Sequence, residues 1–237
     1  MRPGSIEKMP AFDKILIIQT AAFGDHILTT ALVETLKASF PHSSIDVLIR
    51  KGNESVFSNN PGVRKMLVLD KSQGKYRSLF RLGREVRAER YGLVVNLHRF
   101  FNLGLLTVLS GARTTVGFDR NPLSRFFTHR EHYAFRKPDG STMHEIERNH
   151  LLIQRWVNGP SLRPRLYPGE SDMRSVEMYK SRPYVCIGVA ASRYTNTLPR
   201  QQWLDLIHAI PAQVRVYLLG AAADIPLCDW LVNGARN

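Results

Sequence analysis

Short runs of aliphatic residues alternate along this chain with stretches of helical periodicity, and this alternation limits the folds open to it. Residues 14–19 (KILIIQ) predict a strand. Residues 27–39 predict a helix, because Leu28, Leu32 and Leu36 fall on one face. Strands that alternate with helices form parallel βαβ units. The chain is therefore expected to form α/β domains with parallel sheets.

The alternation continues through residues 1–157, which we predict to form one Rossmann-like domain. Its further strands are expected at residues 44–49, 65–69, 93–97 and 115–118, and its further helices at residues 77–90 and 143–157. Residues 158–183 contain four prolines and two glycines, a composition typical of a linker.

Residues 184–237 begin a second alternation. Strands are expected at residues 184–189 and 214–219, and helices at residues 199–210 and 224–232. A doubly wound domain usually needs five or six strands to bury both faces of its sheet. We therefore expect residues 184–237 to be part of a second Rossmann-like domain that is truncated at its C-terminal side.

The net charge of +13 is unevenly distributed. Residues 184–237 hold four arginines and three aspartates, so +12 of the charge falls on residues 1–183. This excess predicts an acidic partner, and nucleic acid, an anionic membrane surface and a phosphorylated glycolipid all have the required chemistry. The sequence has no zinc-ligand spacing and no aromatic-plus-basic recognition motif, which argues against nucleic acid.

The sequence has no apolar leader and no uninterrupted membrane-spanning stretch. The first apolar run, residues 15–18, has the length of a strand, and polar residues interrupt the longest apolar region, residues 92–112. We expect a cytoplasmic protein with peripheral contact to the inner face of the inner membrane.

Ligands of parallel α/β sheets bind where the strands end, which selects the loops at residues 19–26 and 190–199. Asp25 in the first loop has two possible roles: it caps a helix, or it is a general base, and the two are compatible. The neighbouring Gly24 would let a ligand approach the backbone. The loop has no Gly-x-Gly-x-x-Gly pattern, so a nicotinamide dinucleotide site is not expected.

Residues 14–70 resemble the opening of the lipopolysaccharide heptosyltransferases, glycosyltransferase family 9. The matching landmarks, in order, are Gly24-Asp25, Thr29-Thr30, Ile45-Asp46 and Asn60-Pro61-Gly62-Val63. Later segments also resemble the family: His144-Glu145-Ile146-Glu147-Arg148, then Ala191-Ser192-Arg193 followed by Pro199 and Trp203, and finally residues 219–224.

This resemblance implies a GT-B fold, in which an N-terminal domain receives a lipid-linked acceptor and a C-terminal domain holds ADP-heptose. It implies that Asp25 is the base of an inverting transfer of heptose to the lipopolysaccharide inner core. The residues expected at the nucleotide-sugar donor are Thr20, Gly24, Ser192, Arg193, Thr195, Asn196 and Asp224. No Asp-x-Asp pair occurs, so neither a metal nor another cofactor is expected.

Arginines are the candidates for binding the anionic acceptor. Arg120 and Arg148 match basic positions of the family. Residues 64–90 hold nine Lys or Arg against three acids, and helical spacing puts Arg77, Arg81 and Arg84 on one face. Such a stripe suits an anionic acceptor, and it also suits a solvated helix surface.

The sequence departs from the family pattern in the first loop, where Ala21 and Ala22 stand in place of a frequent Ser, and at two places on the donor side. Residues 196–199 read Asn-Thr-Leu-Pro, where relatives carry Lys-x-Trp-Pro, and the family's Asp-Ser-Gly-x-x-His segment is not found in the chain. The alternative to an enzyme is therefore a truncated, non-catalytic chain of the same family that binds glycolipid.

Overall fold

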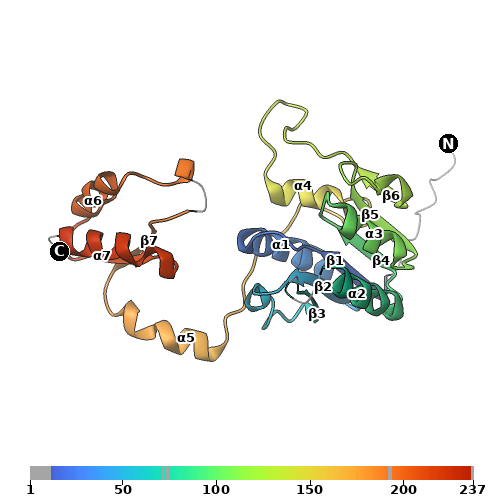
Figure 1. The fold of residues 1–237 in the computed structure, drawn as a ribbon, viewed down its shortest axis with the longest axis horizontal. Helices are drawn as coiled ribbons and strands as arrows, with labels where there is room; N and C mark the ends of the chain where they lie inside the picture. The colour runs from blue at the N-terminus through green and yellow to red at the C-terminus, as the bar shows by residue number, and fades with distance from the viewer. Residues whose placement is uncertain (1–11, 71, 73–74, 192–193, 236–237) are drawn as a thin grey trace. The chain divides into compact units, whose positions relative to one another are not determined.

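The computed structural model describes residues 12–70, 72, 75–191 and 194–235. The chain divides into two compact units, Met1–Tyr167 and Pro168–Asn237 (Figure 1). Each unit contains its own sheet and its own hydrophobic core. They are therefore described one after the other.

The N-terminal unit is built on a six-stranded parallel sheet with the strand order β3-β2-β1-β4-β5-β6. The strands are β1 (Lys14–Ile18), β2 (Ser44–Arg50), β3 (Val63–Leu69), β4 (Leu93–Asn96), β5 (Thr114–Phe118) and β6 (His129–Glu131). The order reverses between β1 and β4, so the connections that leave these neighbouring strands diverge. In a sheet of this kind, the opening at the carboxyl ends of such a strand pair is the usual ligand position.

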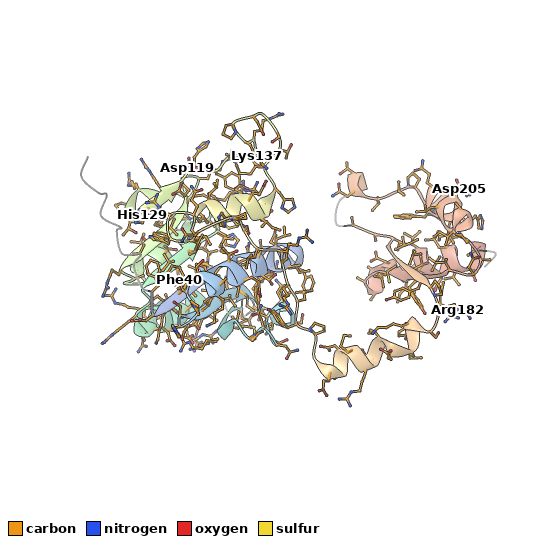
Figure 2. The ribbon with its side chains drawn as sticks, turned by 180° about the vertical axis from the view of Figure 1, so that it is seen from behind. Phe40, Asp119, His129, Lys137, Arg182 and Asp205 are labelled. Atoms are coloured by element: carbon orange, nitrogen blue, oxygen red, sulfur yellow. The ribbon has the colours of Figure 1, made fainter. Side chains whose placement is uncertain are left out.

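Helices cover both faces of this sheet. The helix α1 (Phe23–Ser39) packs on α4 (Glu145–Leu151), and α2 (Lys75–Glu89) packs on α3 (Phe101–Leu109). Successive residues of β1 point to opposite faces: Ile15 and Ile17 join the core under α1 and α4, whereas Leu16 and Ile18 join the core under α2 and α3. Side chains fill both layers (Figure 2). Double coverage explains why β1 is apolar at consecutive positions.

The five strands expected from the sequence for this unit are present, and two elements were not expected. Strand β6 has only three residues, His-Arg-Glu, without an apolar pattern, and α3 lies within residues 92–112, the apolar region that polar residues interrupt. Two helix lengths also differ from the prediction. Helix α1 begins at Phe23, four residues early, and α4 ends at Leu151, after which the chain continues in turns.

The first part of the expected linker is fixed to the N-terminal unit. Two threonine hydroxyls on α1 accept hydrogen bonds from backbone amides of this segment. Leu162 N lies 3.0 Å from Thr35 Oγ1, and Arg165 N lies 3.0 Å from Thr30 Oγ1. The phenol of Tyr167 donates to Glu34 at 3.0 Å. The remainder contains helix α5 (Glu170–Glu177), so residues 158–183 are not uniformly extended.

The C-terminal unit contains a two-stranded parallel sheet of β7 (Tyr184–Gly188) and β8 (Arg215–Leu219). The helices α6 (Arg200–Ala209) and α7 (Ile225–Gly234) lie near the expected positions. Val189, Ile207 and Leu231 form a small buried core. Among the helices in the described residues, none is both long and apolar enough to span a bilayer.

Candidate functional site

The carboxyl ends of β1 and β4 meet at the point where the strand order reverses. The backbone amide of Thr20, just after β1, donates to His98 Nε2 at 2.6 Å, and the Thr20 hydroxyl lies 3.3 Å from the same nitrogen. His98 follows β4, and Thr20 and His98 are both buried. The structure therefore places Thr20, expected at the donor, in contact with His98, which is not among the site residues predicted from the sequence.

Asp25 occupies the first turn of α1. Its Oδ2 accepts the backbone amide of Ala22 at 2.8 Å, so the capping role is confirmed for one oxygen. Asp25 is the third residue of the helix rather than the residue before it. Within the described residues, Oδ1 has no hydrogen-bond partner. Apart from its chain neighbours and the backbone of its own helix, no atom lies within 4 Å of the place where a side chain on Gly24 would begin. The carboxylate is half-buried beside open space.

A second carboxylate lies near Asp25, at the start of α4. Burial raises the pKa of Glu145, the negative charge of Asp25 raises this pKa further, and the cation of Arg148 lowers it. Because α1 packs on α4, two distant segments of the sequence bring these two acids within electrostatic reach of one another. Glu145 is not among the site residues predicted from the sequence. Its position within the family-like motif at residues 144–148 was the available signal.

Arg120 and Arg148 meet around two aromatic rings. The Arg120 guanidinium lies 4.7 Å from the ring centre of Tyr133 and 5.1 Å from that of Phe135. The Arg148 guanidinium lies 4.7 Å and 5.6 Å from the same two rings. Arg148 Nη2 is 3.4 Å from a carboxylate oxygen of Glu145.

Arg148 is only 7% exposed, which is uncommon for an arginine. Its Nε finds no hydrogen-bond partner among the described residues. A buried donor without a partner is costly, and a ligand oxygen would relieve that cost. The two arginines expected by resemblance at the acceptor are thus gathered into one cluster with Glu145, and Glu145 lies near Asp25.

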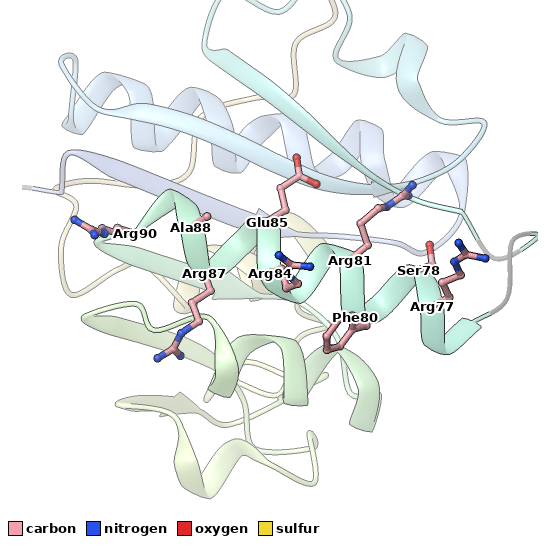
Figure 3. A pocket seen from close by; sticks show the side chains of 9 residues that line it. All are labelled: Arg77, Ser78, Phe80, Arg81, Arg84, Glu85, Arg87, Ala88 and Arg90. Atoms are coloured by element: carbon pink, nitrogen blue, oxygen red, sulfur yellow. The ribbon is translucent and has the colours of Figure 1, made fainter.

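The other three expected acceptor residues lie on the opposite face of the sheet. Arg77, Arg81 and Arg84 are on α2, where they line an exposed hollow together with Phe80 (Figure 3). Helix α2 covers the core that contains Leu16 and Ile18, whereas α1 and α4 cover the other core. The stripe predicted from the spacing exists, but the structure does not bring it beside Arg120 and Arg148.

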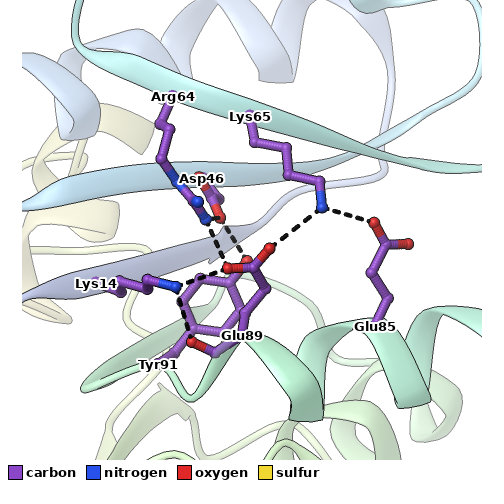
Figure 4. Close-up of polar contacts among 7 residues, drawn as sticks. All are labelled: Lys14, Asp46, Arg64, Lys65, Glu85, Glu89 and Tyr91. Carbon is purple, nitrogen blue, oxygen red and sulfur yellow. Dashed lines mark hydrogen bonds and ion pairs between the residues drawn. The ribbon is translucent and has the colours of Figure 1, made fainter.

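An ion-pair network occupies the amino end of β1, away from these groups (Figure 4). Asp46 is fully buried, accepts the phenol of Tyr91 at 2.6 Å and pairs with Arg64. Arg64 and Lys14 each lie 2.9 Å from Glu89, and their hydrogen bonds lower the pKa of Glu89 to about 2. Asp46, one of the family-like landmarks, therefore has a structural role here.

Three donor-side residues expected in the C-terminal unit are described. Thr195 and Asn196 are exposed in a 3₁₀ turn, Tyr194–Asn196, and the hydroxyl of Thr195 donates to Asn196 Oδ1 at 3.3 Å. One oxygen of Asp224 accepts the amide of Ala221 at 2.7 Å, which caps the turn before α7. Ser192 and Arg193 lie outside the described residues. No three His, Cys, Asp or Glu side chains gather as possible metal ligands in the part of the chain that the structure describes.

Comparison with known proteins finds the same family. A profile of glycosyltransferase family 9 (heptosyltransferase) matches residues 79–227. Lipopolysaccharide heptosyltransferase 3 of Escherichia coli (strain K12) is 30% identical over 141 residues, which cover 55% of this chain and 39% of that protein. Lipopolysaccharide heptosyltransferase 1 of Campylobacter coli is 27% identical over 117 residues, or 49% of this chain and 34% of that protein. The chain thus matches less than half the length of these curated relatives.

Solved structures resemble the chain over nearly its whole length. A family 9 glycosyl transferase from Veillonella parvula DSM 2008 has a TM-score of 0.82 at 19% identity, covering 95% of this chain and 68% of that one. The E. coli ADP-heptose lipopolysaccharide heptosyltransferase II has a TM-score of 0.73 at 20% identity, covering 94% and 69%. These neighbours confirm the predicted GT-B fold class. Since the family profile matches more than half of the chain, this protein belongs to glycosyltransferase family 9, the heptosyltransferases.

Proposed function

We propose that the protein transfers heptose from ADP-heptose to the inner core of lipopolysaccharide, with inversion and without a metal or other cofactor. Membership of family 9 supports glycosyl transfer. Two observations support the donor and the acceptor: curated relatives are lipopolysaccharide heptosyltransferases, and the structural neighbour E. coli heptosyltransferase WaaC was solved with ADP. In this proposal the enzyme works at the cytoplasmic face of the inner membrane and has no nucleic-acid partner.

The observation that carries the proposal is the position of Asp25. Its Oδ2 is held by the Ala22 amide, and its Oδ1 has no partner among the described residues. In the proposed reaction Oδ1 takes the proton of an acceptor hydroxyl as that oxygen attacks the anomeric carbon of the donor. The bond from the sugar to the diphosphate breaks on the opposite side, and ADP leaves with the bonding electrons.

The charged groups near Asp25 suit an anionic acceptor. In the proposal, Arg120 and Arg148 bind its phosphates or carboxylates, since a guanidinium carries several N–H donors that match the oxygens of such groups, and both guanidiniums lie against the Tyr133 ring. Glu145 lies within electrostatic reach of Asp25, and its burial together with the charge of Asp25 raises the pKa of Glu145.

The donor is assigned to the C-terminal unit. Its diphosphate would meet the free amides at the start of α6, close in sequence to Ser192, Arg193, Thr195 and Asn196, while Asp224 would accept from the nucleoside. The competing function is a glycolipid-binding chain without catalysis. It is favoured by residues 196–198, which carry no lysine to neutralise a diphosphate.

The test uses the protein, ADP-heptose and a lipid acceptor that lacks heptose, with the mass gain of the acceptor measured by mass spectrometry. Asp25→Asn retains an oxygen to cap α1 and is expected to lower transfer by about 10²- to 10⁴-fold. Asp172→Asn is the matched control, because Asp172 caps α5 through the Gly169 amide at 2.8 Å in the same way. Equal activity of the two variants refutes Asp25 as the base. Acceptor binding by the unaltered protein without any transfer would support the non-catalytic alternative.

A further inference from the structure

An exposed apolar surface runs along α3 in the N-terminal unit. Leu103 and Leu106 face the core and are buried, but the other side of the helix is also apolar. The exposed fractions are 57% for Phe101, 40% for Leu105 and 53% for Leu109. A helix that is apolar on all sides is normally covered, and contiguous exposed apolar side chains mark a surface that binds something.

The apolar surface continues onto α2. Phe80 is 71% exposed, and it lines a groove with Phe101, Leu105 and Leu109. In Figure 3, Phe80 projects from α2 toward the neighbouring helix. The two helices therefore contribute apolar side chains to one groove.

Arginines lie directly beside this apolar groove. Phe80, Arg84 and Arg87 line both the apolar groove and the arginine hollow on α2, so the groove and the hollow form one continuous surface. We call it the α2–α3 face, formed by Arg77, Phe80, Arg81, Arg84, Arg87, Phe101, Leu105 and Leu109.

The cations of the α2–α3 face are not neutralised. In the described residues no acid forms an ion pair with Arg77, Arg81, Arg84 or Arg87, and all four are exposed. By contrast, Lys14, Arg64 and Lys65, which approach α2 from the strands, are all paired with Glu85 or Glu89. Unpaired positive charge thus lies directly beside the apolar groove.

We propose that the α2–α3 face docks on an anionic lipid bilayer. Apolar side chains next to unpaired arginines are the chemistry of an interfacial site, in which Phe and Leu enter the acyl boundary and the guanidiniums meet negative headgroups. A symmetric second copy fits less well, because it would bring two rows of arginines together. This inference goes beyond glycosyl transfer, since the face lies on the side of the sheet opposite to α1 and α4.

Co-sedimentation with vesicles tests the docking. The full chain is mixed with vesicles of phosphatidylcholine alone, or with vesicles that also contain phosphatidylglycerol, and neither kind contains lipopolysaccharide. We expect binding to the second kind, and we expect salt to weaken it.

Two double variants separate the apolar and the charged parts of the face. Arg81→Ser with Arg84→Ser is expected to weaken binding about 30-fold, at about fivefold per cation. Phe80→Ser with Phe101→Ser is expected to weaken it by about tenfold or more, while the salt dependence remains.

The matched control joins Arg174→Ser with Met178→Ser, an exposed arginine and a 72% exposed methionine of the C-terminal unit, and is expected to bind like the unaltered chain. Thermal melts report folding of every variant, and the arginine pair leaves the core untouched.

Several results would overturn the inference. These are failure to bind anionic vesicles, equal binding to neutral vesicles, and control and test variants that bind alike. Displacement of vesicles by a single-stranded oligonucleotide would assign the face to nucleic acid instead. A dimer in analytical ultracentrifugation that the phenylalanine pair dissociates would assign it to a second copy. Transfer to a soluble acceptor, measured in a separate reaction with ADP-heptose, stays independent of all these outcomes.

Discussion

Glu89 anchors the amino end of the sheet, and its removal gives a test with a defined size and a defined pH range. The change Glu89→Gln keeps the shape of the side chain but removes the charge that Lys14, Arg64 and Lys65 share. The pKa of Glu89 falls from 4.5 to about 2 in the folded protein. At about 1.4 kcal/mol per pKa unit, this depression corresponds to at most about 3.5 kcal/mol of folding free energy. Water reaches the paired cations and weakens these interactions, so we expect Glu89→Gln to lower the free energy of unfolding by about 1 to 2 kcal/mol at neutral pH.

The direction of the pH dependence follows from the lowered pKa. A carboxylate that the folded state stabilises adds stability above its unfolded pKa, and this contribution is lost as the pH falls from 4.5 toward about 2. The difference in free energy of unfolding between the unaltered protein and Glu89→Gln should therefore be constant near neutrality and shrink on acidification.

Urea unfolding at a series of pH values between neutrality and the acid transition measures this difference. The control is Glu177→Gln, because Glu177 pairs with Lys180 at 2.9 Å but has a side chain that is 73% exposed. Glu177→Gln should lower the free energy of unfolding by less than about 0.5 kcal/mol at every pH. The reasoning is refuted if Glu89→Gln costs no more than this control, or if its cost persists undiminished in acid.

Three further changes probe the cluster near Asp25. Gly24→Ala should raise the free energy of unfolding, measured in urea, by about 0.5 kcal/mol, since Gly24 is helical and has open space around it. It should lower transfer if a ligand approaches the backbone at Gly24. A lower free energy of unfolding would contradict this reasoning. Arg148→Met should lower the free energy of unfolding by about 2 kcal/mol, because it leaves the half-buried Glu145 without its cation. Arg148→Lys should recover part of this loss in the same assay. Equal losses for the two variants would rule out a stabilising ion pair. Asp25→Asn should lower the pKa of Glu145, because a nearby negative charge is removed. NMR titration of the Glu145 carboxyl measures this pKa, and an unchanged value would contradict the expected coupling of the two acids.

Local sequence patterns were sufficient for most elements of the fold. The periodicity of Leu32 and Leu36 is satisfied by one buried helix face, and the apolar run of β1 is buried on both sides. Such patterns depend on backbone geometry over a few residues, so they are visible without the fold. Strand β6 carries no such pattern, because it is a short edge strand whose residues pair with β5 without entering the core.

The composition of the candidate site depended on contacts between distant segments. Sequence alone determined the alternating architecture, the position of Asp25 near the amino end of the first helix and the presence of a basic stripe on α2. Only the tertiary structure decided that Arg120 and Arg148 share two aromatic rings, that Glu145 lies near Asp25, and that the α2 stripe covers the other face of the sheet. The physical reason is that the periodicity of a helix is a local property of its own sequence. The face of the sheet that the helix covers is set instead by the path of the crossover connection and by packing against the rest of the chain.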